Sequence, residues 1–477
     1  MSAEMMVPVQ RKGPHRLSEA FEKSVRELLG SRWSQSESVR EHHGRDESSY
    51  PPMPPDGVAF VESSEEVSAV LKLCQTHRVP VIPFGNGSSV EGHVLAVEGG
   101  ISLDMSRMAR VLDIHAEDFA VSVQPGLSRK QLNEELRSTG LFFPIDPGAD
   151  ASIGGMCATA ASGTNAVRYG TMRENVLALT VVLIDGRIIR TGTRARKSSA
   201  GYDLTHLFIG SEGTLGVITE ITLRLHPQPE QILAASCSFP RIADAVGTVV
   251  QIIQYGMAIS RVEFIDALAV QAINAYSKLD MPGQPTLFFE FAGSPAAVQE
   301  QVAIVAGLVA AAGGSDFAWA EQQEDRNRLW HARHQAYFAA LQLKPGCRAM
   351  ATDVCVPISR LAECVEATVA DLATSTIPAP IVGHVGDGNF HLIMLIDPEQ
   401  PEEWEEAERI NRRLVARAIA MEGSCTGEHG IGLHKMGFLR DQAGDDAVDV
   451  MRSLKQALDP LNLMNPGKIF AAQAARD

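Results

Sequence analysis

Apolar residues along this chain recur with two periods, one typical of helices and one typical of strands. A return every three or four positions predicts a helix around residues 67–74, and helices are also expected at 17–29, 402–421 and 446–458. Short apolar or alternating runs that stop at glycine or proline predict strands. The predicted strands are residues 79–84, 101–104, 120–123, 219–225, 232–239, 261–265 and 286–291.

Local cap and turn signals add detail to this pattern. Ser128 followed by Gln131 predicts a capping box at the start of a helix over residues 131–137. The pair Asp185-Gly186 predicts a hairpin turn within residues 180–191, because this dipeptide suits a tight turn between two strands.

The composition is that of a globular protein with more than one domain. The chain has 477 residues, of which 45% are hydrophobic and 21% are charged. The sequence Pro227-Gln228-Pro229 predicts a boundary, and we expect domains at residues 1–228, 229–425 and 426–477. The net charge of −16 argues against nucleic acid or an anionic membrane surface as a partner.

Cysteine usage and the N-terminus bear on the compartment. The seven cysteines include no C-x-x-C pair, which fits a reducing compartment, and Cys74, Cys157 and Cys364 are expected to be buried free thiols. No apolar run reaches the length of about 18 residues that predicts a transmembrane helix. Residues 1–16 lack the apolar stretch of a secretory signal, which leaves a short transit peptide as the alternative. We expect a soluble cytoplasmic protein, at most peripheral to an inner membrane, or a mitochondrial one in a eukaryote.

Histidines and a glutamate lie on glycine-rich backbone in the last quarter of the chain. His384 and His391 flank a Gly-Asp-Gly turn, and Glu428 and His429 follow between two further glycines. Two imidazoles and a carboxylate predict an open divalent-metal site. His429 is a candidate general base near neutral pH. The alternative is that His384 and His391 only hydrogen-bond within a turn and that Glu428 is solvated.

Three glycine-rich stretches predict a cradle for one extended cofactor. Residues 85–89 follow a strand and offer N–H groups and hydroxyls to a pyrophosphate, but match neither a Rossmann nor a Walker fingerprint. Residues 148–164 are almost all Gly, Ala, Ser, Thr or Cys, and residues 210–218 again combine glycine with small polar residues. Such backbone can lie against a flat ligand. The alternatives are an ordinary turn for the first stretch and close helix packing for the second.

Three longer motifs carry a resemblance to a known family. They are DPGADAS at residues 146–152, ASGTNAVRYGTMR at 161–173 and TDVCVPISR at 352–360. From about residue 39 to residue 468 the chain resembles the cytochrome-linked, FAD-dependent D-lactate dehydrogenases of the vanillyl-alcohol oxidase flavoprotein superfamily. The resemblance implies an α+β fold, with an FAD-binding domain of two subdomains, a cap domain with an antiparallel sheet and the substrate site, and a C-terminal segment that returns to the flavin.

By this resemblance FAD is held without a covalent bond, because Ser88 and Ser89 occupy the neighbourhood where covalent members carry a histidine. Residues 83–89 and 153–163 are expected to hold the diphosphate, and residues 212–218 the adenine and ribose. The residues so assigned are Pro83, Gly85, Asn86, Gly87, Ser88, Ser89, Pro147, Gly148, Ile153, Gly154, Gly155, Thr159, Ser162, Gly163, Asn165, Glu212, Gly213, Gly216, Ile218 and Asn465.

The resemblance also assigns the catalytic residues. His384, His391 and Glu428 become the ligands of a divalent metal, zinc or manganese with iron also open, and His429 becomes the base. Arg333 becomes the anchor of the substrate carboxylate, a role that suits its planar fork. From the sequence alone, a surface cation on a helix is the favoured explanation of Arg333.

The expected reaction is oxidation of a D-2-hydroxyacid, with hydride transfer to flavin N5. Relatives that act on D-2-hydroxyglutarate carry a lysine and an asparagine where this chain has Ala351 and Ile393, so a second carboxylate would lie unpaired. D-lactate is therefore the expected substrate, a small 2-hydroxy-monocarboxylate. Glycolate, 2-hydroxybutyrate, 2-hydroxyglutarate and bulkier apolar D-2-hydroxyacids are alternatives.

Other assignments stay open at this stage. The electron acceptor is expected to be a cytochrome, a quinone or an electron-transfer flavoprotein, because the chain has no nicotinamide fingerprint. Two other classes are a non-redox flavoenzyme similar to alkyl-glycerone-phosphate synthase and a flavin-bearing subunit that docks in a respiratory complex.

Overall fold

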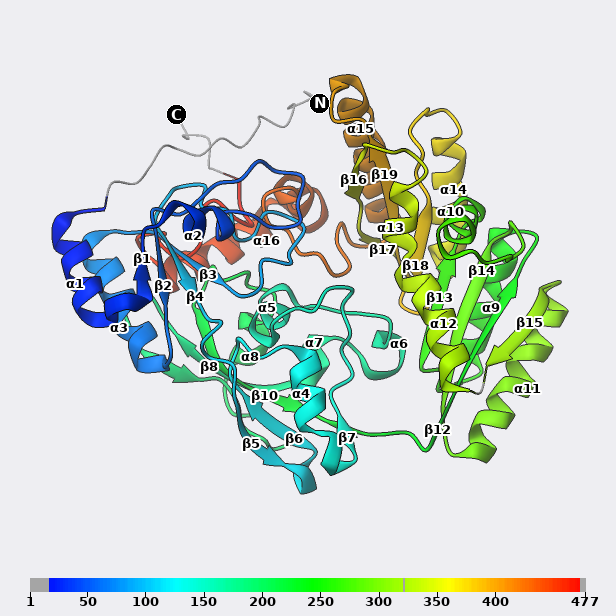
Figure 1. Cartoon of the computed structure of the whole chain (residues 1–477), viewed down its shortest axis with the longest axis horizontal. Coiled ribbons are helices and arrows are strands. Elements are labelled where there is room, and N and C mark those ends of the chain that lie inside the picture. The colour runs from blue at the N-terminus through cyan, green and yellow to red at the C-terminus, as the bar shows by residue number, and fades with distance from the viewer. Residues whose placement is uncertain (1–16, 321, 472–477) are drawn as a thin grey trace. The chain divides into compact units, whose positions relative to one another are not determined.

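The computed structural model describes residues 17–320 and 322–471, so the transit peptide considered for residues 1–16 lies outside the described part (Figure 1). Of these residues, one compact unit, unit 1, comprises 17–161, 171–227 and 428–471. The other, unit 2, comprises 162–170 and 228–427. The domain ranges predicted from the sequence stay a prediction.

Unit 1 begins with a small sheet in which β2, β3 and β4 are parallel and β1 lies antiparallel at one edge, in the order β1-β2-β4-β3. Its elements are α1 (Glu19–Leu29), η1 (Gly30–Arg32), β1 (Trp33–Ser34), α2 (Glu37–His42), β2 (Gly57–Phe60), α3 (Ser64–His77), β3 (Val81–Phe84) and β4 (Ile101–Asp104). The apolar face of α3, including Val67 and Leu71, is fully buried against this sheet's core. Because parallel strands end at the same edge, the loop after Phe84 leaves the sheet beside the ends of β2 and β4.

A second sheet of unit 1 has five antiparallel strands in the order β5-β6-β10-β8-β9. Its strands are β5 (Val111–His115), β6 (Ala120–Val123), β8 (Val176–Val182), β9 (Ile188–Arg190) and β10 (Val217–Arg224), and β7 (Leu141–Phe142) pairs with β11 (His226–Pro227). The short helices around it are η2 (Ala116–Asp118), α4 (Arg129–Glu135), η3 (Arg137–Thr139), α5 (Ile153–Thr159), α7 (Met172–Asn175) and α8 (Leu204–Phe208). A continuous apolar core joins α5 to β6 and β10.

The C-terminal residues complete unit 1. After α16 (Met436–Leu458), which is interrupted at Gly444, the chain runs along β3. The N–H of Val81 donates to the carbonyl of Leu463, and the N–H of Asn465 donates to the carbonyl of Val81, both at 2.8 Å. Asn465 therefore lies next to the strand that leads into residues 85–89.

Unit 2 is built on an eight-stranded antiparallel sheet in the order β15-β12-β14-β13-β18-β19-β16, with β17 also paired to β19. The strands are β12 (Gln231–Ser238), β13 (Arg261–Ile265), β14 (Thr286–Gly293), β15 (Ser315–Ala320), β16 (Arg348–Ala351), β17 (Val354–Cys355), β18 (Ile381–His384) and β19 (Asn389–Ile396). The helices are α6 (Ala166–Tyr169), α9 (Ile242–Gln254), α10 (Ala267–Ser277), α11 (Pro295–Ala311), α12 (Gln323–His334), α13 (Ala336–Leu341), η4 (Ile358–Arg360), α14 (Leu361–Leu372) and α15 (Pro401–Ala420).

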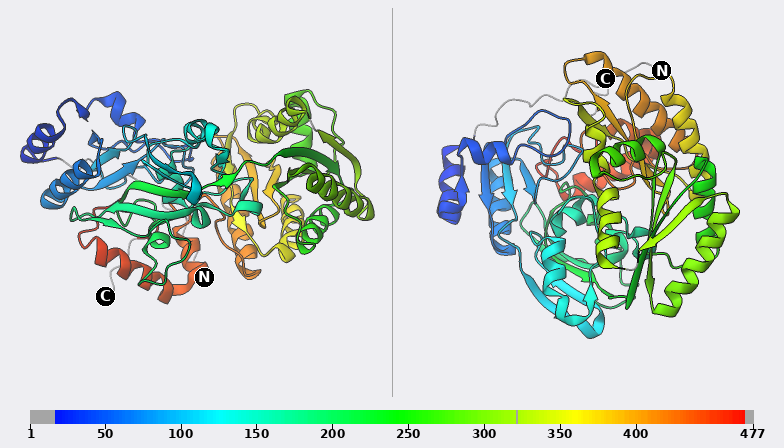
Figure 2. Two further views of the ribbon diagram at one scale, coloured as in Figure 1. Left: turned by 90° about the horizontal axis from the view of Figure 1, so that it is seen from below. Right: turned by 45° about the vertical axis from the view of Figure 1, so that its right-hand side comes forward.

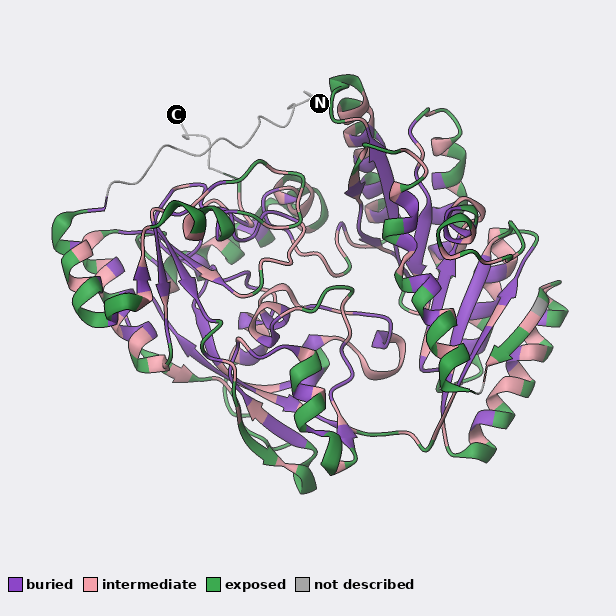
Figure 3. Cartoon of the chain, in the orientation of Figure 1, coloured by how far each residue is buried: buried purple, intermediate pink, exposed green. Residues whose placement is uncertain are grey.

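Helices lie on both faces of the unit 2 sheet, as the right-hand view of Figure 2 shows. One group is α10, α12 and α13, which packs on Ile265, Phe288 and Ile393. The other includes α9, α11 and α14. The central strands are buried along most of their length (Figure 3). A sheet covered on both faces explains why β14 and β19 are apolar at nearly every position rather than at every second one.

Most of the predicted elements are confirmed. The strands predicted at residues 101–104, 120–123 and 261–265 are β4, β6 and β13, and the capping box of Ser128 and Gln131 is present at α4. The predicted hairpin turn at Asp185-Gly186 is confirmed, because β8 and β9 pair on either side of it and the N–H of Gly186 donates to the carbonyl of Leu183 at 2.8 Å. All seven cysteines lie in the described residues and are free thiols, with Cys74, Cys157 and Cys364 buried as predicted.

The observed architecture is the predicted one. Unit 1, with parallel and antiparallel strands, and unit 2, with an antiparallel sheet covered by helices, together give the α+β class.

Candidate active site

His384 and His391 face each other across a hairpin of unit 2. His384 ends β18 and pairs with Asn389, whereas His391 lies two residues further along β19, so both side chains are on the same face of the sheet. Their ring centroids are 5.6 Å apart. The turn between the strands depends on Gly388, which has φ +81°, and a Cβ atom there would lie 2.0 Å from the carbonyl oxygen of Val356.

Each of these imidazoles is held by a hydrogen bond from Nδ1. His384 Nδ1 is 2.7 Å from Oε1 of Glu263, and His391 Nδ1 is 2.8 Å from the carbonyl oxygen of Thr352. Both partners are acceptors, so Nδ1 carries the proton and Nε2 carries the lone pair in each ring. The two rings offer ligand atoms within 4.8 Å of each other. This donor chemistry fits a divalent metal, since metal-binding histidines are usually oriented by such a bond.

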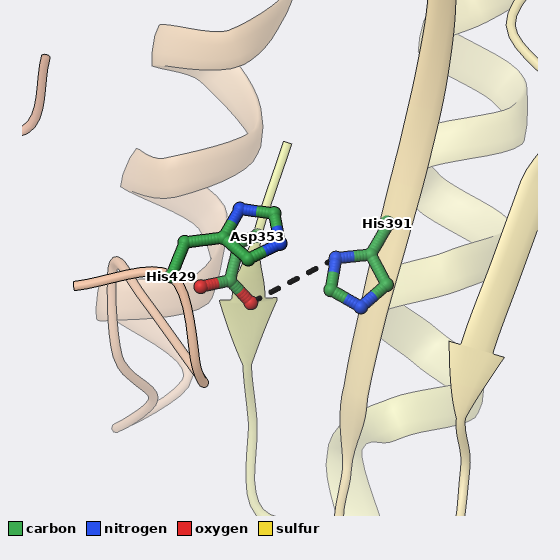
Figure 4. Close-up of side chains that lie close together, drawn as sticks. All are labelled: Asp353, His391 and His429. Atoms are coloured by element: carbon green, nitrogen blue, oxygen red, sulfur yellow. Dashed lines mark ion pairs between the residues drawn. The ribbon is translucent and has the colours of Figure 1, made fainter. Parts of the chain in front are cut away.

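Asp353 holds the backbone that leads to Glu428. It is 1% exposed and lies 3.8 Å from Nδ1 of His391, the pair drawn with a dashed line in Figure 4. Its carboxylate accepts hydrogen bonds from Nδ2 of Asn389 (2.8 Å), Oγ1 of Thr426 (2.6 Å) and the N–H of Gly427 (2.8 Å). A Cβ atom at Gly427 would lie 2.2 Å from Nδ2 of Asn389, so only glycine fits there. The sequence contained Asp353 within a motif but gave no indication of this role.

Arg333 is buried, which contradicts its interpretation as a surface cation. It lies near the end of α12, is 8% exposed, and donates from Nη2 to Oε2 of Glu263 at 2.6 Å. Among the described residues its Nε has no hydrogen-bond partner. A buried guanidinium whose Nε still lacks an acceptor can bind a second acidic group, such as a substrate carboxylate. Sequence reasoning missed Glu263, which with Arg261 is one of two charged residues on β13.

Ala351 and Ile393 are directly opposite each other on β16 and β19. Ile393 is buried and lies on the same face as His391, two residues away. The apolar positions noted in the sequence are therefore neighbours in space.

Glu428 and His429 belong to unit 1, where they open the C-terminal segment. His429 Nδ1 lies 3.4 Å from Oε1 of Glu91, which is 2% exposed. Glu91 also faces Lys435 Nζ at 2.9 Å and His434 Nδ1 at 3.3 Å. Burial by itself would raise the pKa of the Glu91 carboxyl, but Lys435 and the two histidines hold it well below its usual range. The Glu91 cluster is thus an ionised carboxylate against three basic side chains, and the sequence did not indicate it.

The three glycine-rich stretches of the predicted cradle meet in unit 1. A Cβ atom at Gly85 would lie 2.3 Å from Oγ of Ser152, the N-cap of α5, and Nδ2 of Asn86 donates to the carbonyl of Asp150 at 2.8 Å. The N–H of Glu212 donates to the carbonyl of Ala158 at 2.8 Å. The three stretches therefore lie together in unit 1, which is the arrangement that one extended cofactor such as FAD needs.

Further contacts in unit 1 support the same cradle. A Cβ atom at Gly213 would lie 3.0 Å from Pro83, and one at Gly154 would lie 2.5 Å from Pro125. Ser89 Oγ donates to Asp46 at 3.0 Å, and Thr159 Oγ1 donates to the carbonyl of Gly155 at 3.1 Å. The remaining assigned residues of unit 1 lie in the same stretches: Gly87, Ser88, Pro147, Gly148, Ile153, Gly216 and Ile218.

Glu212 and Asn465 use their side chains to join segments of unit 1. The Glu212 carboxylate accepts the N–H groups of Ile431 (2.7 Å) and Gly432 (2.9 Å), and Nδ2 of Asn465 donates to the carbonyl of Glu212 at 2.8 Å. Lys468, also missed in the sequence, donates to the carbonyl of Leu95 at 2.7 Å. The C-terminal segment is therefore bound to the loops around the cradle.

Three assigned FAD residues lie elsewhere. Ser162, Gly163 and Asn165 belong to the short segment that clusters with unit 2. Asn165 Oδ1 accepts a hydrogen bond from Nε of Arg261 at 2.8 Å. In this structure the Asn165 side chain is engaged with β13.

Comparison with known protein families identifies the chain. The FAD binding domain family matches residues 55–192, and the family of FAD linked oxidase C-terminal domains matches residues 228–469. A protein of Danio rerio named probable D-lactate dehydrogenase, mitochondrial, is 55% identical over 91% of this chain and 88% of its own length. The chain belongs to the FAD-dependent D-lactate dehydrogenase family.

Other relatives agree with this membership. The cytochrome-type D-lactate dehydrogenase of Arabidopsis thaliana is 49% identical over 87% of this chain and 73% of its own length. The glycolate oxidase subunit GlcD of Bacillus subtilis is 34% identical over 88% of this chain and 90% of its own length. The family makes this chain a flavin-dependent oxidoreductase.

Solved structures support the fold. A 4-ethylphenol oxidase from Gulosibacter chungangensis superposes with a TM-score of 0.77 at 17% identity, covering 96% of this chain and 98% of that one. An alkyldihydroxyacetonephosphate synthase superposes with a TM-score of 0.74 at 20% identity, covering 96% and 86%. These likenesses show the vanillyl-alcohol oxidase type of fold and not the reaction. Within the described residues, no helix has the length and apolar content needed to span a bilayer.

Proposed function

We propose that this flavoprotein oxidises D-lactate to pyruvate at a site that also binds a divalent metal. The observation that carries the proposal is the pair His384 and His391, whose Nδ1 atoms are both bound to acceptors, together with the buried Arg333 that shares Glu263 with His384. A metal site beside a buried guanidinium suits a substrate with a hydroxyl next to a carboxylate.

Oxidation of a 2-hydroxyacid removes a proton from the hydroxyl and a hydride from Cα. Bound FAD supplies the two-electron acceptor, and a metal on His384, His391 and Glu428 supplies a Lewis acid that makes the hydroxyl more acidic. His429 takes the hydroxyl proton as general base. The paired Glu91 carboxylate, whose pKa is held low, favours the protonated form of this imidazole and so stabilises it after proton transfer.

The preference for a monocarboxylate is argued from the apolar pair of β16 and β19. Ala351 and Ile393 provide neither a cation nor a hydrogen-bond donor in their side chains. Leaving a carboxylate unpaired against them would cost several kcal/mol, which disfavours 2-hydroxyglutarate. Glycolate and 2-hydroxybutyrate are the nearest competing substrates. Glycolate is included because the chain is similar to a glycolate oxidase subunit.

The electron acceptor is proposed to be a cytochrome, because relatives at 40–49% identity are named cytochrome-type D-lactate dehydrogenases. Quinones and electron-transfer flavoproteins are the other acceptors to test. Since those relatives and the Danio rerio protein are named mitochondrial, a mitochondrial location is proposed if this chain is eukaryotic.

An anaerobic titration tests the proposed function. The absorbance of the oxidised flavin is recorded while D-lactate, L-lactate, glycolate and D-2-hydroxyglutarate are added separately to the purified protein. Bleaching by D-lactate and not by L-lactate is expected, with loss of the effect after a chelator and recovery with zinc or manganese.

His429→Ala is the diagnostic variant in this titration, and His434→Ala is its matched control. The His429→Ala protein should keep its flavin spectrum. D-lactate should reduce its flavin at least about 100-fold more slowly, as expected when a general base is lost. The second removes another imidazole beside Glu91 and should be reduced at close to the normal rate. A flavin that no 2-hydroxyacid bleaches would favour the non-redox or docking classes instead.

A further inference from the structure

Glu263 joins two residues of the proposed site that are far apart in the sequence. It lies on β13, and its side chain is 1% exposed. Oε1 accepts from Nδ1 of His384 at 2.7 Å, while Oε2 accepts from Nη2 of Arg333 at 2.6 Å. One buried carboxylate thus contacts both the imidazole assigned to the metal and the guanidinium assigned to the substrate.

We infer that Glu263 is a positioning residue, which fixes the metal-binding tautomer of His384 and holds Arg333 beside it. The inference rests on the proposed function, because it takes the assigned roles of these two residues as given. An ionised carboxylate can only accept hydrogen bonds, so its contact with Nδ1 leaves the His384 lone pair on Nε2. His391 obtains the same tautomer from the backbone carbonyl of Thr352, at 2.8 Å.

The same carboxylate sets the direction of Arg333. A single N–H of the guanidinium is used for Glu263, and the buried Nε has no hydrogen-bond partner among the described residues. A planar guanidinium tethered at Nη2 has a fixed orientation, so Nε is presented to a second acceptor. The chemical class that fits this acceptor position is a small carboxylate. Because Glu263 holds both Arg333 and His384, it would set the distance between that carboxylate and a metal on His384.

The competing explanation is that Glu263 and Arg333 are only a structural ion pair. Breaking a buried pair destabilises a protein whatever its function, so a loss of stability would not distinguish the two explanations. Metal affinity and the tautomer of His384 do distinguish them, because a structural pair has no reason to affect either one in a folded protein.

The test uses Glu263→Gln and Glu263→Asp in the full-length, FAD-loaded protein. Glutamine has one acceptor oxygen for two donors, and aspartate keeps the charge but is one methylene too short to reach both partners. Zinc affinity is measured by competition with a chelator. In metal-free protein labelled with nitrogen-15 histidine, long-range nitrogen–proton correlations report the His384 tautomer, assigned with His384→Asn. Glu290→Gln is the matched control, because Glu290 lies on the adjacent strand and pairs with Arg261 instead.

We expect each Glu263 variant to bind zinc about 10- to 100-fold more weakly, as loss of such a supporting contact does. The His384 signals should change from a single tautomer to a mixture, and KM for D-lactate should rise more than kcat falls. Glu290→Gln should behave as the unsubstituted protein. Folded Glu263→Gln with unchanged zinc affinity and unchanged His384 signals would overturn the inference, and Glu263→Asp decides it if the glutamine variant does not fold.

Failure of the proposed function gives a different result. If the unsubstituted protein binds no zinc or manganese, the metal assignment is wrong. The tautomer measurement on metal-free protein then still decides whether Glu263 positions His384.

Discussion

Lys468 is 3% exposed, and its amino group donates to the carbonyl of Leu95 and to the side-chain oxygen of Asn465 in unit 1. Burial lowers the pKa of this amine to about 7, although Asp46, Glu212 and Glu98 partly offset the effect. An unfolded lysine titrates near its ordinary value of 10.5. Between these two values the unfolded chain binds a proton that the folded chain does not, so this residue makes the protein more stable as pH rises.

Replacing this amine tests the effect. In the apoprotein, Lys468→Met removes the group that titrates, so the unsubstituted protein should gain stability relative to the variant by up to about 1.4 kcal/mol per pH unit between pH 7.5 and 9.5. Urea denaturation at several pH values measures this difference. Lys23→Met, at an exposed lysine, is the control and should show no such slope. A difference that is independent of pH would show that Lys468 keeps an ordinary pKa in the folded protein.

At the residue scale, sequence reasoning identified side chains within compact motifs and missed their partners. His384, His391 and Arg333 were selected from local motifs and a family resemblance. Glu263 was not, because it lies 121 residues from His384 and on β13 it only alternates with the apolar residues Val262 and Phe264. Only the pairing of β13 with β18 brings it to the site. Contacts made through a sheet register leave no local signal in the sequence.

At the element scale, the hairpin of β18 and β19 carries both histidines and depends on its turn. Gly388 has φ +81°, and a Cβ atom would meet the carbonyl oxygen of Val356 at 2.0 Å. Gly388→Ala should therefore be destabilising by more than the 1–3 kcal/mol or so of a strained backbone, because the turn must also move. A shift of the turn displaces His384, so metal affinity should fall as well.

Gly346→Ala is the matched control for this prediction. Gly346 also lies in unit 2 and has φ +84°, but no atom lies within 4 Å of its added Cβ. Urea denaturation measures the loss of unfolding free energy in each variant. The strained backbone conformation contributes to both losses, whereas the contact with Val356 contributes only to that of Gly388→Ala. Equal losses of stability would mean that the turn can accept the side chain.

Elements with both a clear period and a local end signal were predicted well. Ile101–Asp104 lies between Gly100 and a turn, and the α4 helix has its capping box. The hairpin of β8 and β9 was predicted as well, because Asp185-Gly186 marks a turn between two apolar runs. The end of β8 at Val182 could not be read from the pattern, since Leu183 and Ile184 are also apolar and buried.

At the scale of the whole molecule, unit 1 is assembled from separate parts of the sequence. The boundary predicted at Pro227 rests on local composition, because proline interrupts a strand pattern. The return of residues 463–465 to β3 could be expected only through the family resemblance, since no local pattern links them to residue 81. The assignment of Ser162–Gly170 to unit 2 was not foreseen, and Arg168 explains it by donating to the carbonyls of Ala258 and Ala292.

This division predicts where FAD should change the dynamics of the chain. Most of the assigned FAD residues lie in unit 1, in segments that are distant from one another in the sequence. A ligand that binds only the folded form slows local opening where it binds. Adding FAD to apoprotein should therefore slow amide hydrogen exchange most in residues 83–89, 153–161, 212–218 and 463–469.

Peptides from β12 and β14 are the internal reference, because those strands pair with each other inside the unit 2 sheet and contain no assigned residue. Their exchange should change little on FAD binding. Mass spectrometry of peptides from the same digest compares all of these segments in one experiment. Equal protection in both units would indicate that FAD stabilises the chain only globally, and protection confined to unit 2 would contradict the cradle. Since the four protected segments are distant in sequence, their joint response would also show that the C-terminal return to β3 is part of the flavin site.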